Sequence, residues 1–224
     1  MPLSSRAYAL YEAFDKPGCP VCRLTLESVR HFLDGLIYEY INEPETHEAL
    51  RAARGFCPTH AWRVQREINA SALGVAVLYE GVLRRLLDDM GSIGPGDGQR
   101  QVSQAASALR PRQPCPACEH QATVEDHLLR NLLAHLDRDE FAAGFRRSEG
   151  ICLPHLRQAL DSPGRIQHKA RLLVIQQAIW EDLQHELAEF VRKSDYRFAL
   201  DEMGSEGTSP RRAIESTAGQ FGIR

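Results

Sequence analysis

Six cysteines and two histidines stand at spacings typical of metal ligands. Each half of the chain carries a Cys-Pro-x-Cys motif and then a Gly-x-Cys-x-x-His motif, and no cysteine is left over. Three thiolates and one imidazole form the tetrahedral donor set that Zn²⁺ prefers. The sequence therefore predicts two Cys3His metal sites, built from Cys19, Cys22, Cys57, His60, Cys115, Cys118, Cys152 and His155.

Each predicted site has four protein ligands, so no coordination position stays open and both ions are predicted to be structural. Zinc is the expected metal, with two ions per chain. An iron–sulfur cluster is the alternative, although such clusters usually take four cysteines. We assign one ion to each half of the chain, as the two sets Cys19, Cys22, Cys57, His60 and Cys115, Cys118, Cys152, His155. The sequence also allows the Cys-Pro-x-Cys motif of one half to share an ion with the Cys-x-x-His motif of the other.

Disulfides and thiol catalysis explain the cysteines less well. Three cysteines in each half cannot all pair within that half, and each trio is accompanied by a histidine. A redox Cys-x-x-Cys of the thioredoxin type needs a βαβ context, and we find no strand pattern. Oxidation of metal-bound thiolates, as in a redox sensor, remains open.

The two halves also share a pattern outside the cysteines, which indicates an internal repeat. When Cys22 is aligned with Cys118, apolar residues fall on one helical face in both halves. His31 and His127 align as well, and could donate to ligand thiolates, but they lie off this apolar face. The predicted fold is an all-α helical bundle of two homologous repeats, each with its own metal site.

Helical periodicity and turn residues give the expected organisation of the chain. The expected helices span residues 4–15, 23–41, 45–54, 61–90, 119–137, 139–147, 154–161 and 165–193. The expected domains are a first metal-binding repeat (1–90), a flexible linker (91–114), a second metal-binding repeat (115–199) and an irregular C-terminal tail (200–224).

Charge and motif content exclude several classes of function. The net charge of −3 argues against nucleic-acid binding, which usually needs a basic face. The longest apolar run has eight residues and the N-terminus lacks the apolar core of a secretion signal, so we expect a cytoplasmic protein without a membrane segment. No catalytic motif is present, so no catalytic residue is assigned, and an enzyme is not indicated.

Several motifs resemble a family of uncharacterised bacterial proteins, catalogued as a domain of unknown function. They are the Cys-Pro-x-Cys at Cys19, the Gly-Phe-Cys-x-x-His at Gly55, Asn69 with the following Leu-Gly, the stretch 193–198, and the Ser-x-Arg-Arg-Ala at Ser209. Pro210 stands where the family is expected to have an aromatic residue. The resemblance implies metal binding and a bacterial source.

Two functions are compatible with these observations. The first is an interaction or scaffold protein with an unknown protein partner, in which metal ions hold the fold together. The second is a redox, electron-transfer or redox-sensing protein that uses iron–sulfur clusters or oxidisable thiolates. The sequence does not decide the oligomeric state.

Overall fold

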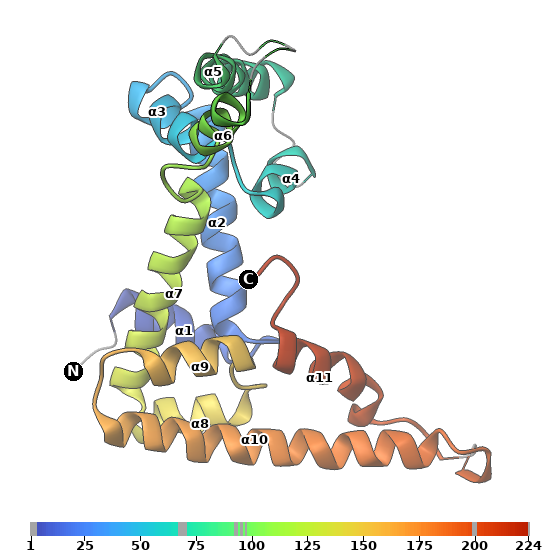
Figure 1. Cartoon of the computed structure of the whole chain (residues 1–224). Coiled ribbons are helices and arrows are strands. Elements are labelled where there is room, and N and C mark those ends of the chain that lie inside the picture. The colour runs from blue at the N-terminus through green and yellow to red at the C-terminus, as the bar shows by residue number, and fades with distance from the viewer. Residues whose placement is uncertain are drawn as a thin grey trace. The chain divides into compact units, whose positions relative to one another are not determined.

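The computed structural model describes residues 4–66, 71–91, 94, 96, 98–198 and 201–223, and all of its regular structure is helical (Figure 1). Within these residues there is no strand, so the prediction of an all-α protein is confirmed. Asn69, one of the residues that carried the family resemblance, lies outside the described residues. The helices are α1 (Ser5–Ala13), α2 (Pro20–Tyr38), α3 (Pro44–Ala53), α4 (Pro58–Arg66), α5 (Ala72–Met90), α6 (Gln99–Ala108), α7 (Pro116–His135), α8 (Asp139–Arg147), α9 (Leu153–Asp161), α10 (Ile166–Lys193), the 3₁₀ turns η1 (Tyr196–Phe198) and η2 (Ser205–Thr208), and α11 (Ser209–Ala218).

All four cysteine motifs lie at helix N-termini. The helices α2, α4 and α7 begin at the proline that follows the first cysteine of each motif, and α9 has its proline in the first turn. Proline suits this position because its fixed φ angle matches the helix and its missing N–H would have no helical partner. The chain therefore turns sharply at each motif, which brings both ligands of the motif toward one point.

The prediction of one continuous helix over residues 61–90 is wrong, because two helices occupy this stretch. The helix α4 is described as far as Arg66, and residues 67–70 lie outside the described residues. Ser71 caps the new helix α5, since its Oγ accepts a hydrogen bond from the Gly74 backbone N–H at 3.1 Å. A Cβ atom on Gly74 would lie 3.0 Å from Ile41 Cδ1, so α5 packs closely at this glycine.

Two segments expected to be irregular contain helices. The predicted linker includes α6, which packs on α5, and the predicted tail includes α11, which packs on α9 and α10. Both helices are polar, so their own sequences give little sign of burial. Tertiary contacts stabilise them, which is a common reason for local propensity to mislead.

The described helices fall into two compact units. Unit 1 comprises Met1–Leu26 and Thr123–Arg224, and unit 2 comprises Glu27–Ala122. The two boundaries fall within α2 and within α7. The division predicted from the sequence, at residues 91–114, does not coincide with this one.

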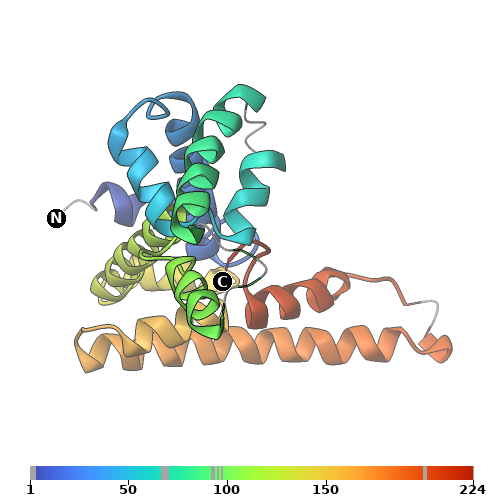
Figure 2. The ribbon, with the colours of Figure 1, turned by 45° about the horizontal axis from the view of Figure 1, so that its top comes forward.

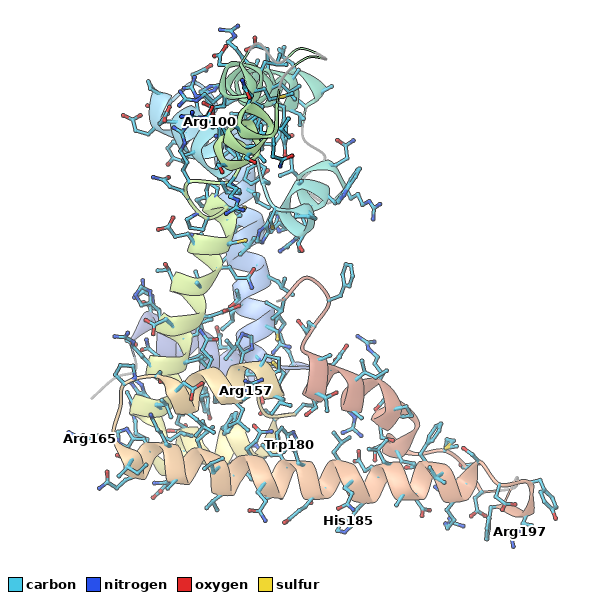
Figure 3. All side chains as sticks on the ribbon, in the orientation of Figure 1. Arg100, Arg157, Arg165, Trp180, His185 and Arg197 are labelled. Carbon is cyan, nitrogen blue, oxygen red and sulfur yellow. The ribbon has the colours of Figure 1, made fainter. Side chains whose placement is uncertain are left out.

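In unit 1 the long helix α10 contacts α8, α11 and both 3₁₀ turns. Figures 1 and 2 both show α11 lying along α10. Trp180, labelled in Figure 3, projects from α10 toward α11, and its Nε1 donates a hydrogen bond to Ser216 Oγ at 2.6 Å. The ring of Phe14 meets that of Phe141 edge-on, with 5.0 Å between centroids, so α1 closes the other end of the unit's core.

In unit 2 the helices α3, α5 and α6 are joined by Arg54, which ends α3 with a φ of 62°. Its guanidinium pairs with Asp89 on α5 and donates to the Ala108 carbonyl at the end of α6. Burial raises the pKa of Asp89, but the contacts with Arg54 and Arg85 outweigh it and hold that pKa below its ordinary value. The core beneath is apolar, with Val29, Leu33, Leu50, Phe56, Leu78 and Val82 among its buried residues.

The pairing of Glu206 with α10 gives unit 1 a pH-dependent stability. Lys193 Nζ lies 2.6 Å from Glu206 Oε1, and this contact together with the Gly204 backbone N–H lowers the carboxyl pKa from 4.5 to about 2. A lowered folded-state pKa stabilises the fold above the unfolded-state pKa, and the stabilisation is lost as the pH falls. We expect Glu206→Gln to unfold more easily than the wild type at neutral pH, and the difference to vanish between pH 4.5 and about 2. Chemical denaturation of both proteins across this range measures it, and a constant difference would contradict it.

No helix among the described residues combines the length and the apolar composition that crossing a membrane requires.

Candidate metal centres

The structure gathers all eight predicted ligands into two clusters, but it groups them differently from our assignment. In each cluster the four ligand atoms lie within 4.8 Å of one another. The assignment of one site to each half of the sequence is wrong; the alternative, in which the two halves share each site, is the arrangement observed. The first cluster is Cys19, Cys22, Cys152 and His155, and the second cluster is Cys57, His60, Cys115 and Cys118.

Each cluster lies within one compact unit. The first cluster belongs to unit 1, where α2 and α9 begin, and the second belongs to unit 2, where α4 and α7 begin. Every cluster thus combines a Cys-Pro-x-Cys motif with a Cys-x-x-His motif from the other half of the sequence. The four motifs that form the clusters all lie at helix N-termini, whose partial positive charge stabilises thiolates.

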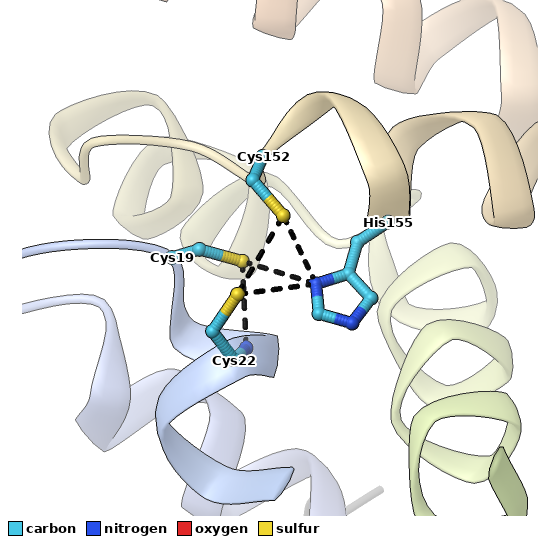
Figure 4. Close-up of side chains that lie close together, drawn as sticks. All are labelled: Cys19, Cys22, Cys152 and His155. Atoms are coloured by element: carbon cyan, nitrogen blue, oxygen red, sulfur yellow. Dashed lines mark hydrogen bonds between the residues drawn. The ribbon is translucent and has the colours of Figure 1, made fainter. Parts of the chain in front are cut away.

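Figure 4 shows the first cluster, in which the three sulfur atoms surround the Nδ1 atom of His155. This nitrogen lies 3.5 Å from Cys19 Sγ, 3.4 Å from Cys22 Sγ and 3.2 Å from Cys152 Sγ. Cys22 Sγ and Cys152 Sγ are 3.5 Å apart, far beyond the length of about 2.05 Å of a disulfide bond. The Cys22 backbone N–H also points at Cys19 Sγ, at 3.5 Å.

The second cluster repeats this geometry. His60 again presents Nδ1, which lies 3.3 Å from Cys57 Sγ, 3.7 Å from Cys115 Sγ and 3.4 Å from Cys118 Sγ. Cys118 Sγ and Cys57 Sγ are 3.5 Å apart. None of the six cysteines forms a disulfide. The clusters differ in burial, because Cys57 and Cys118 are half-buried whereas all four ligands of the first cluster are buried.

These distances match a tetrahedron around one ion. With Zn–S bonds of about 2.3 Å and Zn–N bonds of about 2.0 Å, tetrahedral geometry places two sulfurs about 3.8 Å apart and sulfur and nitrogen about 3.5 Å apart. The observed separations of 3.2 to 3.7 Å lie close to these values in both clusters. Both clusters could therefore hold a metal ion of this size.

The pKa values of the ligands in the first cluster are shifted in opposite directions. Burial raises the pKa of Cys19, but contacts with Cys152, Cys22 and His155 lower it well below the ordinary value. Contacts with Cys152 and Cys19 raise the pKa of Cys22. Burial lowers the pKa of His155, yet contacts with Cys152 and Cys19 raise it to about 12. Metal binding needs three thiolates and a neutral imidazole, whereas these shifts keep the Cys22 thiol and the His155 ring protonated. A divalent cation supplies the positive charge that lets these groups lose their protons.

Glu125 approaches the histidine of the first cluster. Its Oε1 lies 3.5 Å from His155 Nε2, the ring nitrogen that faces away from the sulfurs. A carboxylate at this nitrogen fixes the ring orientation and makes the other nitrogen a stronger ligand. Glu125 follows Cys118 by seven residues on α7. The corresponding position on α2, seven residues after Cys22, is Val29, which has no carboxylate.

We expect Glu125→Gln to weaken metal binding in the first cluster by about 10- to 100-fold and to leave the second cluster unchanged. A chelator competition that resolves two ions per chain measures this, with the second ion as internal reference. Asp126→Ala is a matched control, because it removes the neighbouring carboxylate on α7, which pairs with Arg130. Equal weakening of both ions would contradict the role of Glu125.

No pattern in the sequence indicated that the C-terminal segment reaches the first cluster. A Cβ atom on Gly219, whose φ is 82°, would lie 3.5 Å from Cys152 Sγ and 3.6 Å from Cys22 Sγ. These distances are ordinary contacts, and it is the positive φ that favours glycine at this position. The end of α11 therefore covers the first cluster. A proline near the start of α11, at Pro210, was the available signal for this helix.

His31 and His127, which align between the two halves, belong to neither cluster. Arg30 Nη2 lies 2.6 Å from His31 Nε2, and the His127 carbonyl accepts a hydrogen bond from Asn131. The structure therefore does not support the idea that these two residues donate to ligand thiolates.

The fold and the clusters define an all-helical protein with two buried sets of Cys and His side chains that could bind metal. Comparison with known proteins gives the family: the chain belongs to the family of unknown function DUF6062, which matches residues 7–223. This confirms the resemblance noted from the sequence. The chain is also 24% identical over 212 residues to an uncharacterised 23.9 kDa protein in the xynA 3′ region of Caldicellulosiruptor sp. (strain Rt8B.4), covering 94% of this chain and 99% of that protein. No solved structure matches the present chain.

Proposed function

We propose that the protein is a helical scaffold in which each Cys3His cluster holds one structural zinc ion. The observation that carries this proposal is the same four-ligand geometry in two separate clusters, with separations close to those of a zinc tetrahedron. Four protein ligands complete the coordination of Zn²⁺, so neither ion would have a position for a substrate.

A single ion in each cluster is favoured over an iron–sulfur cluster by the compactness of the ligand sets. In an iron–sulfur cluster the protein ligands bind different iron atoms, which spreads them apart. Here the four ligand atoms of each set lie within 4.8 Å of one another, as ligands of one ion do. The Cys3His composition also favours a single ion, since iron–sulfur clusters usually take four cysteines.

The ions would act as cross-links between distant parts of the chain. Cys22 and Cys152 are 130 residues apart, and Cys57 and Cys118 are 61 residues apart. A link across a long loop removes more conformational freedom from the unfolded chain than a link across a short one. We propose further that the two halves are homologous repeats that have exchanged half-sites, because both α2 and α7 begin at Cys-Pro-x-Cys and both α4 and α9 at Cys-x-x-His.

We place this scaffold in the bacterial cytosol, with a protein as its unknown partner. The free state of all six cysteines supports a reducing compartment. The proposal includes no catalytic residue.

A redox-sensing role is the second candidate, and the second cluster favours it. Cys57 and Cys118 are only half-buried, so an oxidant could reach their sulfurs more easily than those of the first cluster. Oxidation of a ligand thiolate removes it from the ion. Under this alternative, one ion is released by peroxide well before the other.

Elemental analysis and an absorption spectrum of protein purified without oxygen test the proposal. Two zinc ions per chain with no visible absorption are expected. Iron with acid-labile sulfide and a visible absorption band would contradict the zinc scaffold and favour electron transfer or redox sensing. Titration with peroxide then separates the two candidates, because a scaffold keeps both ions under mild oxidation whereas a sensor releases one.

A further inference from the structure

The helix α5 has a buried side and, opposite it, a side on which large apolar side chains are exposed. Gly74, Leu78 and Val82 occupy its buried side. On the opposite side, large apolar side chains are exposed, and Leu73 and Leu87 are 74% and 67% exposed. Contiguous exposed apolar surface of this kind marks an interaction site more often than a single exposed leucine does. The other exposed apolar residues of the helix are Val77, Leu83 and Met90.

The spacing along this face is that of a coiled-coil seam. Leu73, Val77, Glu80, Arg84 and Leu87 follow one another at alternating intervals of four and three residues. This interval pattern keeps side chains on the stripe that faces a partner helix. The two charged residues in the middle, Glu80 and Arg84, are exposed and pair with each other along the helix.

We propose that this face binds a second copy of the chain, with the two α5 helices antiparallel across a two-fold axis. The axis lies at the level of residue 82, on the side of α5 opposite the buried Val82 side chain. Glu80 and Arg84 are each two residues from Val82, and Val77 and Leu87 are each five residues from it. A two-fold axis at that point brings Glu80 beside Arg84 of the second copy, and Val77 beside Leu87 of the second copy. The face is therefore complementary to itself in charge and in apolar contact, as an isologous interface requires.

The charges decide the direction of the pairing and the kind of partner. A parallel pair in register would place Glu80 beside Glu80 and Arg84 beside Arg84, which repel each other. Polar residues within a seam commonly fix orientation in this way, at a cost in stability. An unrelated partner would not require Val77, Glu80, Arg84 and Leu87 to be spaced symmetrically about residue 82, and this symmetry favours a second copy. Leu73 falls opposite Gly91 and lies outside the symmetric set.

The proposed dimer does not depend on the metal assignment, since none of the eight ligands lies on α5. A helix of 19 residues is about 28 Å long, so a single helix pair makes a small interface. We therefore expect a concentration-dependent dimer rather than a permanent one.

Sedimentation equilibrium of the full metal-loaded chain tests the dimer. Across the micromolar to near-millimolar range we expect the mean mass to rise from that of one chain toward that of two. A monomer throughout this range would overturn the proposal. The exposed face of α5 would then have to bind a different protein, if it binds one.

Charge reversal tests the antiparallel pairing. Glu80→Arg and Arg84→Glu each place like charges across the axis, so each variant alone should dimerise about tenfold or more weakly than the wild type. An equimolar mixture of the two variants restores opposite charges between chains, although each chain keeps its like charges along the helix. Recovery of the dimer in the mixture is the expected result, and failure to recover would overturn the pairing.

A pair of matched variants tests the apolar contact. Leu87→Glu should abolish the dimer, whereas Val174→Glu on α10, at a residue with nearly the same exposure of 69%, should leave it intact. Circular dichroism and metal content show whether both variants remain folded. Equal effects of the two substitutions on dimerisation would contradict a specific α5 interface.

Discussion

His155→Ala is expected to release one of two metal ions and to unfold unit 1, while unit 2 keeps its ion and its helices. His155 is buried, and its Nδ1 lies within 3.5 Å of all three sulfurs of the first cluster. A structural zinc ion contributes about 10 kcal/mol or more in small zinc modules, which is as much as the whole stability of many domains. Loss of a packed side chain alone would cost only about 2–5 kcal/mol and would not change the metal content.

Metal analysis combined with amide hydrogen exchange measures this effect. We expect one ion per chain, with fast exchange in α8 to α11 and slow exchange in α3 and α5. The control is His135→Ala, because His135 is a half-buried histidine of unit 1 that bonds the Asn131 carbonyl instead of a sulfur. A His155→Ala protein that retains two ions, or one that loses structure equally in both units, would contradict the assignment of this cluster to unit 1.

Removal of both ions is expected to have the largest effect on the whole chain. Without a cation, three thiols and an imidazole lie close together in each cluster. In the first cluster the pKa of Cys19 is lowered while that of Cys22 is raised, so its thiols do not all ionise together. For a chain of this size about 1 kcal/mol shifts the melting temperature by roughly 2–4 °C, so loss of the ions should lower it by tens of degrees.

Thermal unfolding with a strong chelator and a reductant tests this expectation. The reductant matters because free thiols 3.5 Å apart could otherwise form disulfides that imitate the ions. Addition of zinc in excess over the chelator should restore the original melting temperature. An unchanged melting temperature after complete metal removal would contradict a structural role.

The eight residues of the two clusters could be predicted from the sequence, but their grouping could not. Cysteine, histidine and proline at fixed short intervals define each half-site, because a half-site is one local turn at a helix start. Which half-sites meet depends on the path of the chain between them. Cys22 and Cys152 are separated by 130 residues, and no local rule connects them.

The errors in the secondary structure have similar causes. The helix α11 is held by contacts such as that of Trp180 with Ser216, which no local pattern reveals. The break before α5 was predictable in principle, because Ser71 is a typical capping residue and its side chain bonds the Gly74 backbone N–H. The apolar spacing on both sides of Ser71 is helical, so the sequence was interpreted as one continuous helix and the cap was missed.

The metal content of two double variants tests the shared arrangement of the clusters most directly. Cys22→Ser with Cys152→Ser removes two ligands from the first cluster only, so one ion per chain should remain. Cys22→Ser with Cys57→Ser removes one ligand from each cluster, so both ions should be weakened or lost. The reverse result, with one ion retained by the second variant and none by the first, would contradict the shared clusters and restore one site to each half of the sequence.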